Sequence, residues 1–274
     1  MSNKEERKPV IQSSMNYTLL NETDNEIERG ECKGVIDEEY LTLSPRFGSI
    51  LPFHLRDINE IRVENYRIIL LTKSLEKVVL FNLGHDFEDF LRVLTRMRNE
   101  VIIKDLLMGE TLRKGDVETE FVYYDENGIE KISGMGRIRL YETGLVMIPE
   151  RGDIFRIPYG DIEKVSEGYY EITLSIELGE RLILRKMGFE HEPFIKALSE
   201  ILNELQSKTV SIIRELFPAI DSFSLRKLAT VMKEGKAVKK SEIDSINPKI
   251  WLEIEKKISS MGLGESFSFL KGLA

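Results

Sequence analysis

The sequence of 274 residues is poor in the side chains that build disulfides and thiolate metal sites. Its one cysteine, Cys32, can form no disulfide within the chain and no zinc site of several thiolates. We therefore expect an intracellular protein. The first residues, 1–8, contain no apolar run, which predicts that there is no signal peptide. The longest apolar runs, such as Ile68–Leu71, have the length of a strand, far short of the roughly 20 residues that span a bilayer.

Basic residues are also in deficit. There are 39 Lys and Arg residues against 47 Asp and Glu residues, which gives a net charge of −8 at pH 7. Such a chain is poorly matched, as a whole, to nucleic acid or to an anionic membrane, although a local basic patch is not excluded. The deficit is uneven, because residues 219–274 hold ten basic and seven acidic residues, a charge of +3, and residues 1–218 carry −11.

Signatures of catalysis and of cofactor binding are missing. The sequence has no GxxxxGK[ST] phosphate loop and no HExxH motif, and Gly134–Gly136 lacks the third glycine of the dinucleotide fingerprint. The three histidines, His54, His85 and His191, lie far apart, and we expect the last two to be solvated at the starts of helices. Cys32 lies between strands, where a lone cysteine is usually a small buried hydrophobe. We therefore expect no enzyme, no cofactor and no metal site.

The sequence does contain an internal repeat. A shift of 104 residues aligns residues 16–104 with residues 120–208 without a gap and gives 22 identities in 89 positions. Turn residues and apolar positions keep register; Gly48, for example, aligns with Gly152. Each copy begins with short predicted strands at intervals of about 8–12 residues, a spacing typical of a sandwich or barrel.

One long amphipathic helix is predicted at the end of each copy, where the hydrophobic period changes to three and four residues. The first helix extends to about Met108, and the second extends from about Glu190 to Phe217. Both carry a second apolar stripe beyond the turns that would close a barrel: Ile102, Ile103, Leu106, Leu107, Val210, Ile212 and Ile213. A helix that is apolar on two sides must bury both. Its partner could be the neighbouring repeat, the C-terminal tail or a second chain, and the last alternative predicts a homodimer.

Six or seven strands followed by one helix in about 100 residues resemble the pleckstrin-homology superfold, especially its GRAM-like branch. The resemblance rests on residues 157–162 (Ile-Pro-Tyr-Gly-Asp-Ile), 170–174 and 182–184, and on Phe194 at the opening of the helix. The first copy keeps Asp57-Ile58 and is otherwise more diverged. The resemblance implies an α+β fold with two tandem pleckstrin-homology-like β-barrel or sandwich repeats, each closed by a long C-terminal helix. We expect the first repeat at residues 1–110 and the second at residues 111–217.

Residues 218–274 are predicted to form an all-α tail domain. Pro218 ends or follows the second long helix. Ser224 is predicted to cap a helix that ends near Gly235, and Ser241–Asp244 approximates a capping box that opens a short helix. Asn247 followed by Pro248 opens a third helix, because a capping residue precedes an N1 proline.

The third tail helix has one apolar face, made of Ile250, Trp251, Ile254 and Ile258. We interpret Trp251 as part of the core of the tail. After Gly262 and Gly264 the tail has an apolar end with Phe267, Phe269 and Leu270. These three residues could dock on the chain's own helices or lie as a short helix in a partner's groove.

Two diverged β repeats followed by a basic helical tail are similar to the archaeal taxis adaptor family CheF, whose members connect the phosphorylated response regulator CheY to the archaellum motor. The resemblance covers essentially the whole chain. It implies a cytoplasmic, non-catalytic homodimer that contacts CheY and the motor proteins at the cytoplasmic face of the archaellum motor. Receiver domains are usually acidic, so we place the CheY contact on the basic tail. The residues expected to make it are Lys239, Lys240, Lys249, Lys256, Phe267, Phe269 and Leu270.

Two other functions are compatible with the sequence. A tandem pleckstrin-homology or GRAM-like module could bind a membrane lipid, or serve as a generic protein-binding module. Lipid binding needs several basic residues at one barrel mouth, and the second copy offers Arg137, Arg139, Arg151 and Arg156 among acidic neighbours. A helix-turn-helix in residues 224–260 could bind nucleic acid, although its last helix mixes Lys249, Lys256 and Lys257 with Glu253 and Glu255.

Overall fold

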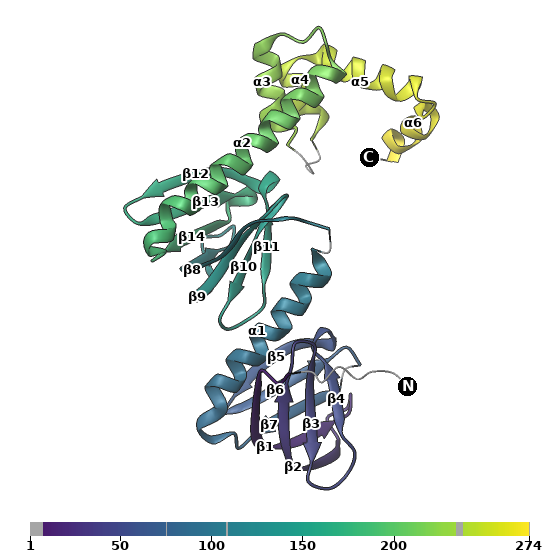
Figure 1. Ribbon diagram of the computed structural model, residues 1–274. Helices are drawn as coiled ribbons and strands as arrows, with labels where there is room; N and C mark the ends of the chain where they lie inside the picture. Colours follow the sequence, from purple (N-terminus) through teal and green to yellow (C-terminus); the bar gives the residue numbers. More distant parts are fainter. Residues whose placement is uncertain (1–7, 75, 108, 234–237, 274) are drawn as a thin grey trace.

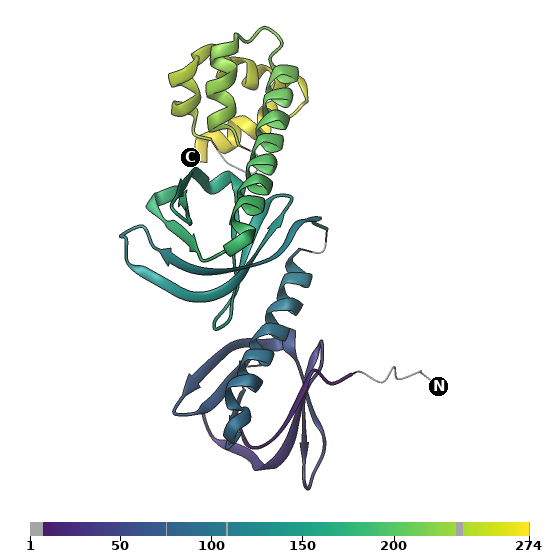
Figure 2. The same cartoon turned by 60° about the vertical axis from the view of Figure 1, so that its left-hand side comes forward.

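A computed structural model describes residues 8–74, 76–107, 109–233 and 238–273. Within these residues the chain forms two antiparallel sheets of seven strands, each followed by a long helix, and four shorter helices at the C-terminal end. Figures 1 and 2 show the three units stacked in a column, with each long helix extending from its own sheet toward the next unit. The chain is therefore a mixed α+β protein with two curled sheets in tandem.

The first sheet has the strand order β4-β3-β2-β1-β7-β6-β5. Its strands are β1 (Ile11–Leu20), β2 (Glu26–Ile36), β3 (Tyr40–Pro45), β4 (Leu51–His54), β5 (Ile58–Glu64), β6 (Arg67–Thr72) and β7 (Lys77–Phe81). Buried and exposed side chains alternate along them, as expected when one face of a sheet is covered. Helix α1 (Phe87–Leu106) covers that face and buries Phe90 and Leu94 among the strand residues.

The second sheet repeats this order as β11-β10-β9-β8-β14-β13-β12. Its strands are β8 (Leu112–Tyr124), β9 (Glu130–Tyr141), β10 (Gly144–Pro149), β11 (Phe155–Pro158), β12 (Ile162–Gly168), β13 (Glu171–Ile176) and β14 (Arg181–Arg185). A shift of 104 residues carries the bounds of β3 to β7 onto those of β10 to β14, which confirms the internal repeat. Helix α2 (His191–Leu216) closes this sheet with Phe194, Leu198 and Ile201.

The second apolar stripe of each long helix is covered by the next unit of the same chain. On α1, Ile103 and Leu107 pack against Tyr141, Val146 and Ile148 of β9 and β10. On α2, the stripe is buried by the tail helices, where Val210 and Ile213 pack with Leu225, Leu228 and Ile243. Leu106 and Ile212 stay exposed, and Met108 lies outside the described residues. The described part of the stripe is thus covered within one chain, except at Leu106 and Ile212.

Arg98 of α1 joins the two sheet units. Its side chain is only 6% exposed, although it carries a charge. Its Nε donates to the carbonyl oxygen of Ile58 at 2.8 Å and its Nη2 to that of Asn59 at 2.5 Å. Its Nη1 donates to Asp153 Oδ1 of the second unit at 2.5 Å. The planar guanidinium presents donors on three separate nitrogen atoms, a spread that the single nitrogen of a lysine does not match.

The tail consists of α3 (Ser222–Val231), α4 (Lys240–Ile246), α5 (Pro248–Ser260) and α6 (Gly264–Leu273). Ser224 does not cap α3, because Asp221 Oδ1 accepts the backbone N–H groups of Phe223 and Ser224. A carboxylate at this position also interacts favourably with the positive end of the helix dipole. The predicted helix end near Gly235 lies outside the described residues, and α3 ends at Val231.

The beginnings of α4 and α5 differ in how well the sequence predicted them. Helix α4 begins earlier than the Ser241–Asp244 pattern suggested, because the Glu242 carboxylate accepts the backbone N–H of Lys239 at 2.9 Å. The start of α5 is confirmed, since Asn247 Oδ1 accepts the backbone N–H of Lys249 and Pro248 follows the cap. The apolar end of the chain is a fourth helix, α6, which follows Gly262 in a left-handed conformation (φ 78°).

Cys32 is buried in the first sheet, as the sequence predicted. Burial raises the pKa of its thiol from 9.0 to about 11, because a thiolate is poorly solvated there. We expect iodoacetamide at pH 8 to alkylate the folded protein at least about 100-fold more slowly than the denatured protein. The neutral thiol stabilises the fold below pH 9, and this contribution is lost as the pH rises through about 11. Equal alkylation rates in the two states, followed by mass spectrometry, would contradict this assignment.

Candidate partner-binding surface of the helical tail

Helices α5 and α6 meet at an aromatic contact that lysines border. The ring of Phe267 on α6 lies 6.4 Å from the ring of Trp251 on α5, measured between centroids. Lys240 Nζ lies 5.9 Å from the centroid of the Trp251 ring, and Lys271 Nζ lies 5.8 Å from that of the Phe267 ring. Cations over aromatic faces are attracted by the ring quadrupole. We call Lys240, Trp251, Glu255, Phe267 and Lys271 the aromatic cluster.

Glu255 holds the aromatic cluster together. Its Oε1 accepts hydrogen bonds from Lys271 Nζ and from Trp251 Nε1, both at 2.7 Å. The hydrogen bond from Lys271, followed by that from Trp251, lowers the pKa of the Glu255 carboxyl. The carboxylate therefore stays ionised and keeps α6 folded back on α5.

Apolar side chains stay exposed beside the aromatic cluster. Leu263, Phe267 and Leu270 are separated by four and three residues and therefore share one face, since Phe267 N–H donates to the carbonyl oxygen of Leu263. That face turns Phe267 inward and leaves Leu270 61% exposed. Phe269 is 69% exposed, and Met261 and Leu263 in the turn before α6 are exposed as well. We call Met261, Leu263, Phe269 and Leu270 the apolar rim.

The outer face of α5 carries two further lysines. Lys249 and Lys256 are seven residues apart, which places them on one face, and exposed Leu252 lies between them. The opposite face of α5 packs inward through Ile250, Ile254 and Trp251. This separation follows from the apolar face that the sequence predicted for this helix. Lys239 is exposed just before α4.

The seven residues predicted from the sequence thus fall into separate groups. Lys240 and Phe267 belong to the aromatic cluster, and Phe269 and Leu270 belong to the apolar rim. Lys249 and Lys256 form the outer face of α5, and Phe267 docks on the chain's own helix. The sequence reasoning missed Lys271 and Leu263 as members of the surface. The spacing of four residues between Leu263 and Phe267, and again between Phe267 and Lys271, could have indicated them.

The arginines considered for lipid binding are engaged in ion pairs. Arg139 makes two hydrogen bonds to the Glu100 carboxylate, at 2.6 and 2.8 Å, and two to the Asp116 carboxylate. Arg137 Nη1 donates to Asp116 Oδ2 at 2.5 Å. Although burial raises the pKa of Asp116, hydrogen bonds and charges of Arg139 and Arg137 outweigh it and lower the pKa.

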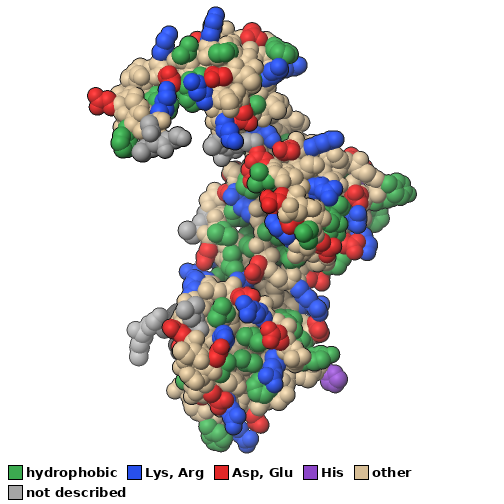
Figure 3. Space-filling view, turned by 180° about the vertical axis from the view of Figure 1, so that it is seen from behind, with side chains coloured by type: hydrophobic (Ala, Val, Ile, Leu, Met, Phe, Trp, Pro, Cys, Tyr) green, Lys and Arg blue, Asp and Glu red, His purple; other side chains and the backbone are tan. Residues whose placement is uncertain are grey.

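The other two arginines also have carboxylate partners. Arg151 Nη2 lies 2.5 Å from Glu88 Oε2, and Arg156 Nη2 lies 2.5 Å from Glu110 Oε1. Both pairs connect the second sheet unit to α1 or to the segment after it. A head group would have to compete with these carboxylates. Figure 3 shows basic and acidic side chains interspersed over the visible face of both sheet units.

His191 is not solvated, contrary to the expectation from the sequence. It is the first residue of α2, and only 8% of it is exposed, because the ring turns inward toward the end of β12. Its Nε2 atom is buried. His85 occupies the corresponding region of the first unit and is exposed, as expected.

No helix in the described part of the chain combines the length and the apolar content needed to cross a membrane.

The comparisons with known proteins give no family. No family model matches the sequence, and no curated protein matches it. Among solved structures, the C-terminal domain of an unknown protein from Leishmania infantum is similar at 15% identity and a TM-score of 0.30, over 38% of this chain and 96% of that chain. The Spt16D–Pob3N heterodimer is similar at 15% identity and a TM-score of 0.23, over 62% of this chain and 85% of that chain. At these TM-scores neither similarity supports an argument about function.

Proposed function

We propose that this protein is a non-enzymatic adaptor that binds an acidic protein partner through its helical tail. One observation carries the proposal: the apolar rim exposes Phe269 and Leu270 on a short helix, next to the lysines of the aromatic cluster. A short helix with exposed aromatic and aliphatic anchors is a common recognition element for a protein groove. Nearby lysines favour an acidic partner and speed its approach.

The arrangement of the two sheet units supports this proposal, because it places the tail at one end of the column. Their strand order, with one helix after the last strand, supports the finer assignment of pleckstrin-homology-like folds. Ile213 of α2 and Phe217, which follows that helix, are buried among the tail residues and connect the tail to the column. The resemblance to CheF implies that the partner is a phosphorylated CheY-type receiver. It also implies that the acidic sheet units contact the archaellum motor at its cytoplasmic face.

The test is a calorimetric titration of the full chain with a purified CheY-type receiver, with and without beryllofluoride as the phosphoryl mimic. We expect binding to require the mimic. The double change Phe269→Ala and Leu270→Ala should weaken binding at least about tenfold, as the loss of exposed anchors does at other interfaces. Phe47→Ala is the matched control, because Phe47 is also an exposed phenylalanine but lies in the first sheet unit.

Two outcomes would contradict the proposal. The full chain could fail to bind the activated receiver, which would reject the CheF-like function. Alternatively, Phe47→Ala could weaken binding as much as the tail variant, which would move the contact away from the tail. Co-sedimentation with anionic liposomes tests the lipid-binding alternative, which the ion pairs of Arg139 and Arg151 make less favourable. A homodimer stays a prediction that light scattering can test.

A further inference from the structure

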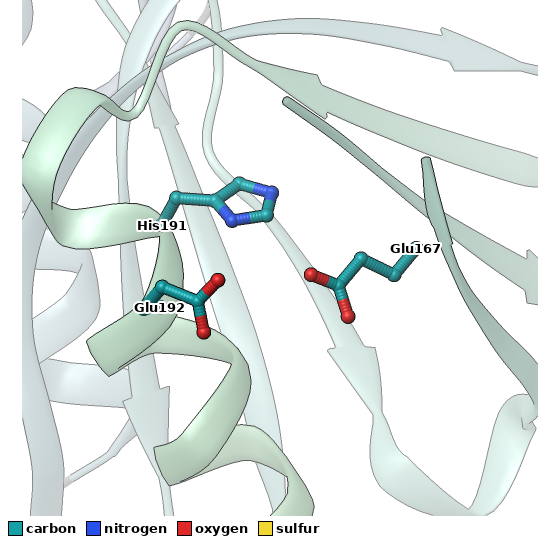
Figure 4. A group of neighbouring side chains, drawn as sticks. All are labelled: Glu167, His191 and Glu192. Carbon is teal, nitrogen blue, oxygen red and sulfur yellow. The ribbon is translucent and has the colours of Figure 1, made fainter. Parts of the chain in front are cut away.

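A histidine and two glutamates converge where the second sheet meets the start of its closing helix. Glu167 lies near the end of β12, and His191 and Glu192 are the first two residues of α2. One ligand atom from each of the three side chains lies within 4.8 Å of the other two. Figure 4 shows the imidazole projecting from the first turn of α2 toward the strand, with the two carboxylates approaching it. We call these residues the His191 cluster.

The side chains of the His191 cluster make no hydrogen bond or ion pair with the residues that the structure describes. His191 is 92% buried, since 8% of it is exposed, and its Nε2 atom makes no hydrogen bond there. No hydrogen bond or ion pair joins the carboxylate of Glu167 or of Glu192 to any described residue. A buried polar atom without a partner costs about 1–3 kcal/mol, so native proteins rarely leave one unsatisfied. The two carboxylates also repel each other at this distance.

The internal repeat supplies a comparison within the same chain. The shift of 104 residues aligns Glu167 with Val63 and His191 with Phe87. The surroundings are equivalent, because Tyr66 contacts the Phe87 ring edge-on at 5.8 Å and Tyr170 contacts the His191 ring edge-on at 6.3 Å. The first unit therefore shows that the fold accepts two apolar side chains, Val63 and Phe87, at these positions.

The third residue of the cluster, Glu192, has a glutamate at the aligned position of the first unit, but the two glutamates differ in their ion-pair partners. Glu88 in the first unit is paired with Arg151 at 2.5 Å, whereas the aligned Glu192 has no described partner. The second unit thus places an imidazole and a carboxylate where the first has apolar side chains, and leaves unpaired a carboxylate that the first neutralises. All three changes concentrate metal-ligand atoms and uncompensated negative charge at one point.

We propose that Glu167, His191 and Glu192 bind a divalent transition-metal ion, for which zinc is the best fit. One imidazole nitrogen and two carboxylate oxygens are ligands that zinc accepts at about 2.0–2.2 Å, with the fourth position left to water. Two ligands at this distance from one ion lie at most about 4.4 Å apart, so small rotations of the exposed glutamate side chains complete the site. Magnesium and calcium require more oxygen ligands than the site offers.

The bound ion would join the β12 strand to the first turn of α2. The positive end of the α2 helix dipole repels a cation. Both carboxylates are therefore needed to bind the ion, and we expect the affinity to be moderate. The ion binds only the folded second unit, so it should stabilise that unit. This inference is independent of the proposed adaptor function.

The test is a calorimetric titration of the full chain with zinc chloride. We expect one zinc ion per chain and a rise in the midpoint of thermal unfolding. His191→Phe and Glu167→Val introduce the residues of the first unit at the aligned positions, so the fold should accept them, and each should weaken zinc binding at least tenfold. Glu167→Gln, at an exposed position, gives a second variant that keeps the shape of the side chain.

The matched control is His85→Phe, which introduces the residue of the second unit, Phe189, at the aligned exposed position of the first. It should leave zinc binding unchanged. Absence of zinc binding by the unaltered chain would overturn the proposal. It would also be overturned if the circular dichroism of Glu167→Gln is unchanged and the variant binds zinc as the unaltered chain does. Millimolar magnesium should not displace the zinc.

Discussion

Replacement of Arg98 by alanine is expected to lower the free energy of unfolding of the sheet units by about 3 kcal/mol. The change removes hydrogen bonds to the carbonyl oxygens of Ile58 and Asn59 and leaves those acceptors at a covered junction. It also removes the ion pair to Asp153, which connects the first unit to the second. Arg98→Lys should restore part of the stability, because an ammonium keeps the charge but has all its donors on one nitrogen, whereas Arg98 reaches its acceptors from three.

The measurement is urea unfolding followed by far-ultraviolet circular dichroism, which reports on the sheets and the helices together. Arg92→Ala is the matched control, since Arg92 lies on the same helix and makes an exposed ion pair with Asp89 at 2.5 Å. Exposed pairs of this kind contribute only about 0.2–1 kcal/mol. If Arg98→Ala and Arg92→Ala unfold at the same urea concentration, Arg98 does not join the units as described.

Leu228→Ala should destabilise the tail by about 3 kcal/mol and leave the sheets unaffected. Leu228 of α3 is fully buried and packs with Ile213, Ile243 and Ile250. The tail core is small, and small units have little stability to lose. We therefore expect the variant to lose much of its tail structure at 37 °C and to lose binding of the activated receiver with it.

Trp251, the single tryptophan of the sequence, allows the tail to be followed separately. Its half-buried ring lies in α5, so its fluorescence reports on the tail, whereas alkylation of the buried Cys32 reports on the first sheet. The fluorescence transition of Leu228→Ala should move to lower urea and the sheet transition should not. Leu252→Ala is the control, because Leu252 is exposed on the same bundle. A joint shift of both transitions would show that the tail and the sheets unfold as one unit.

The sequence was most informative where the signal is local. Strand segments and the long helices show as hydrophobic periods of two and of three to four residues, which depend only on near neighbours. The repeat of 104 residues extends this pattern over two units, and β3 to β7 reappear at that shift as β10 to β14. The cap at Asn247 and the buried state of Cys32 follow in the same way. The apolar end around Phe267 was recognised, but not that α6 folds back onto Trp251.

The tail surface was predicted in part. Its residues are near one another in the sequence, but which of them face outward depends on how α6 packs on α5. Phe269 and Leu270 are exposed, whereas Phe267 turns inward because a tryptophan sixteen residues earlier lies opposite it. The pairing of Lys271 with Glu255 depends on the same fold-back. The assignment of the partner stays a prediction from the resemblance to CheF.

The sequence by itself therefore determined the two α+β repeats, the helical tail and the contrast in charge between them. Only the tertiary structure decided which surface covers the second stripe of each long helix, and which carboxylates neutralise the arginines of the second repeat. It alone brought Glu167 within reach of His191, 24 residues later in the chain. The physical reason is that periodicity records which side of an element is apolar, whereas pairing, burial of a polar ring and ligand geometry depend on where distant segments meet.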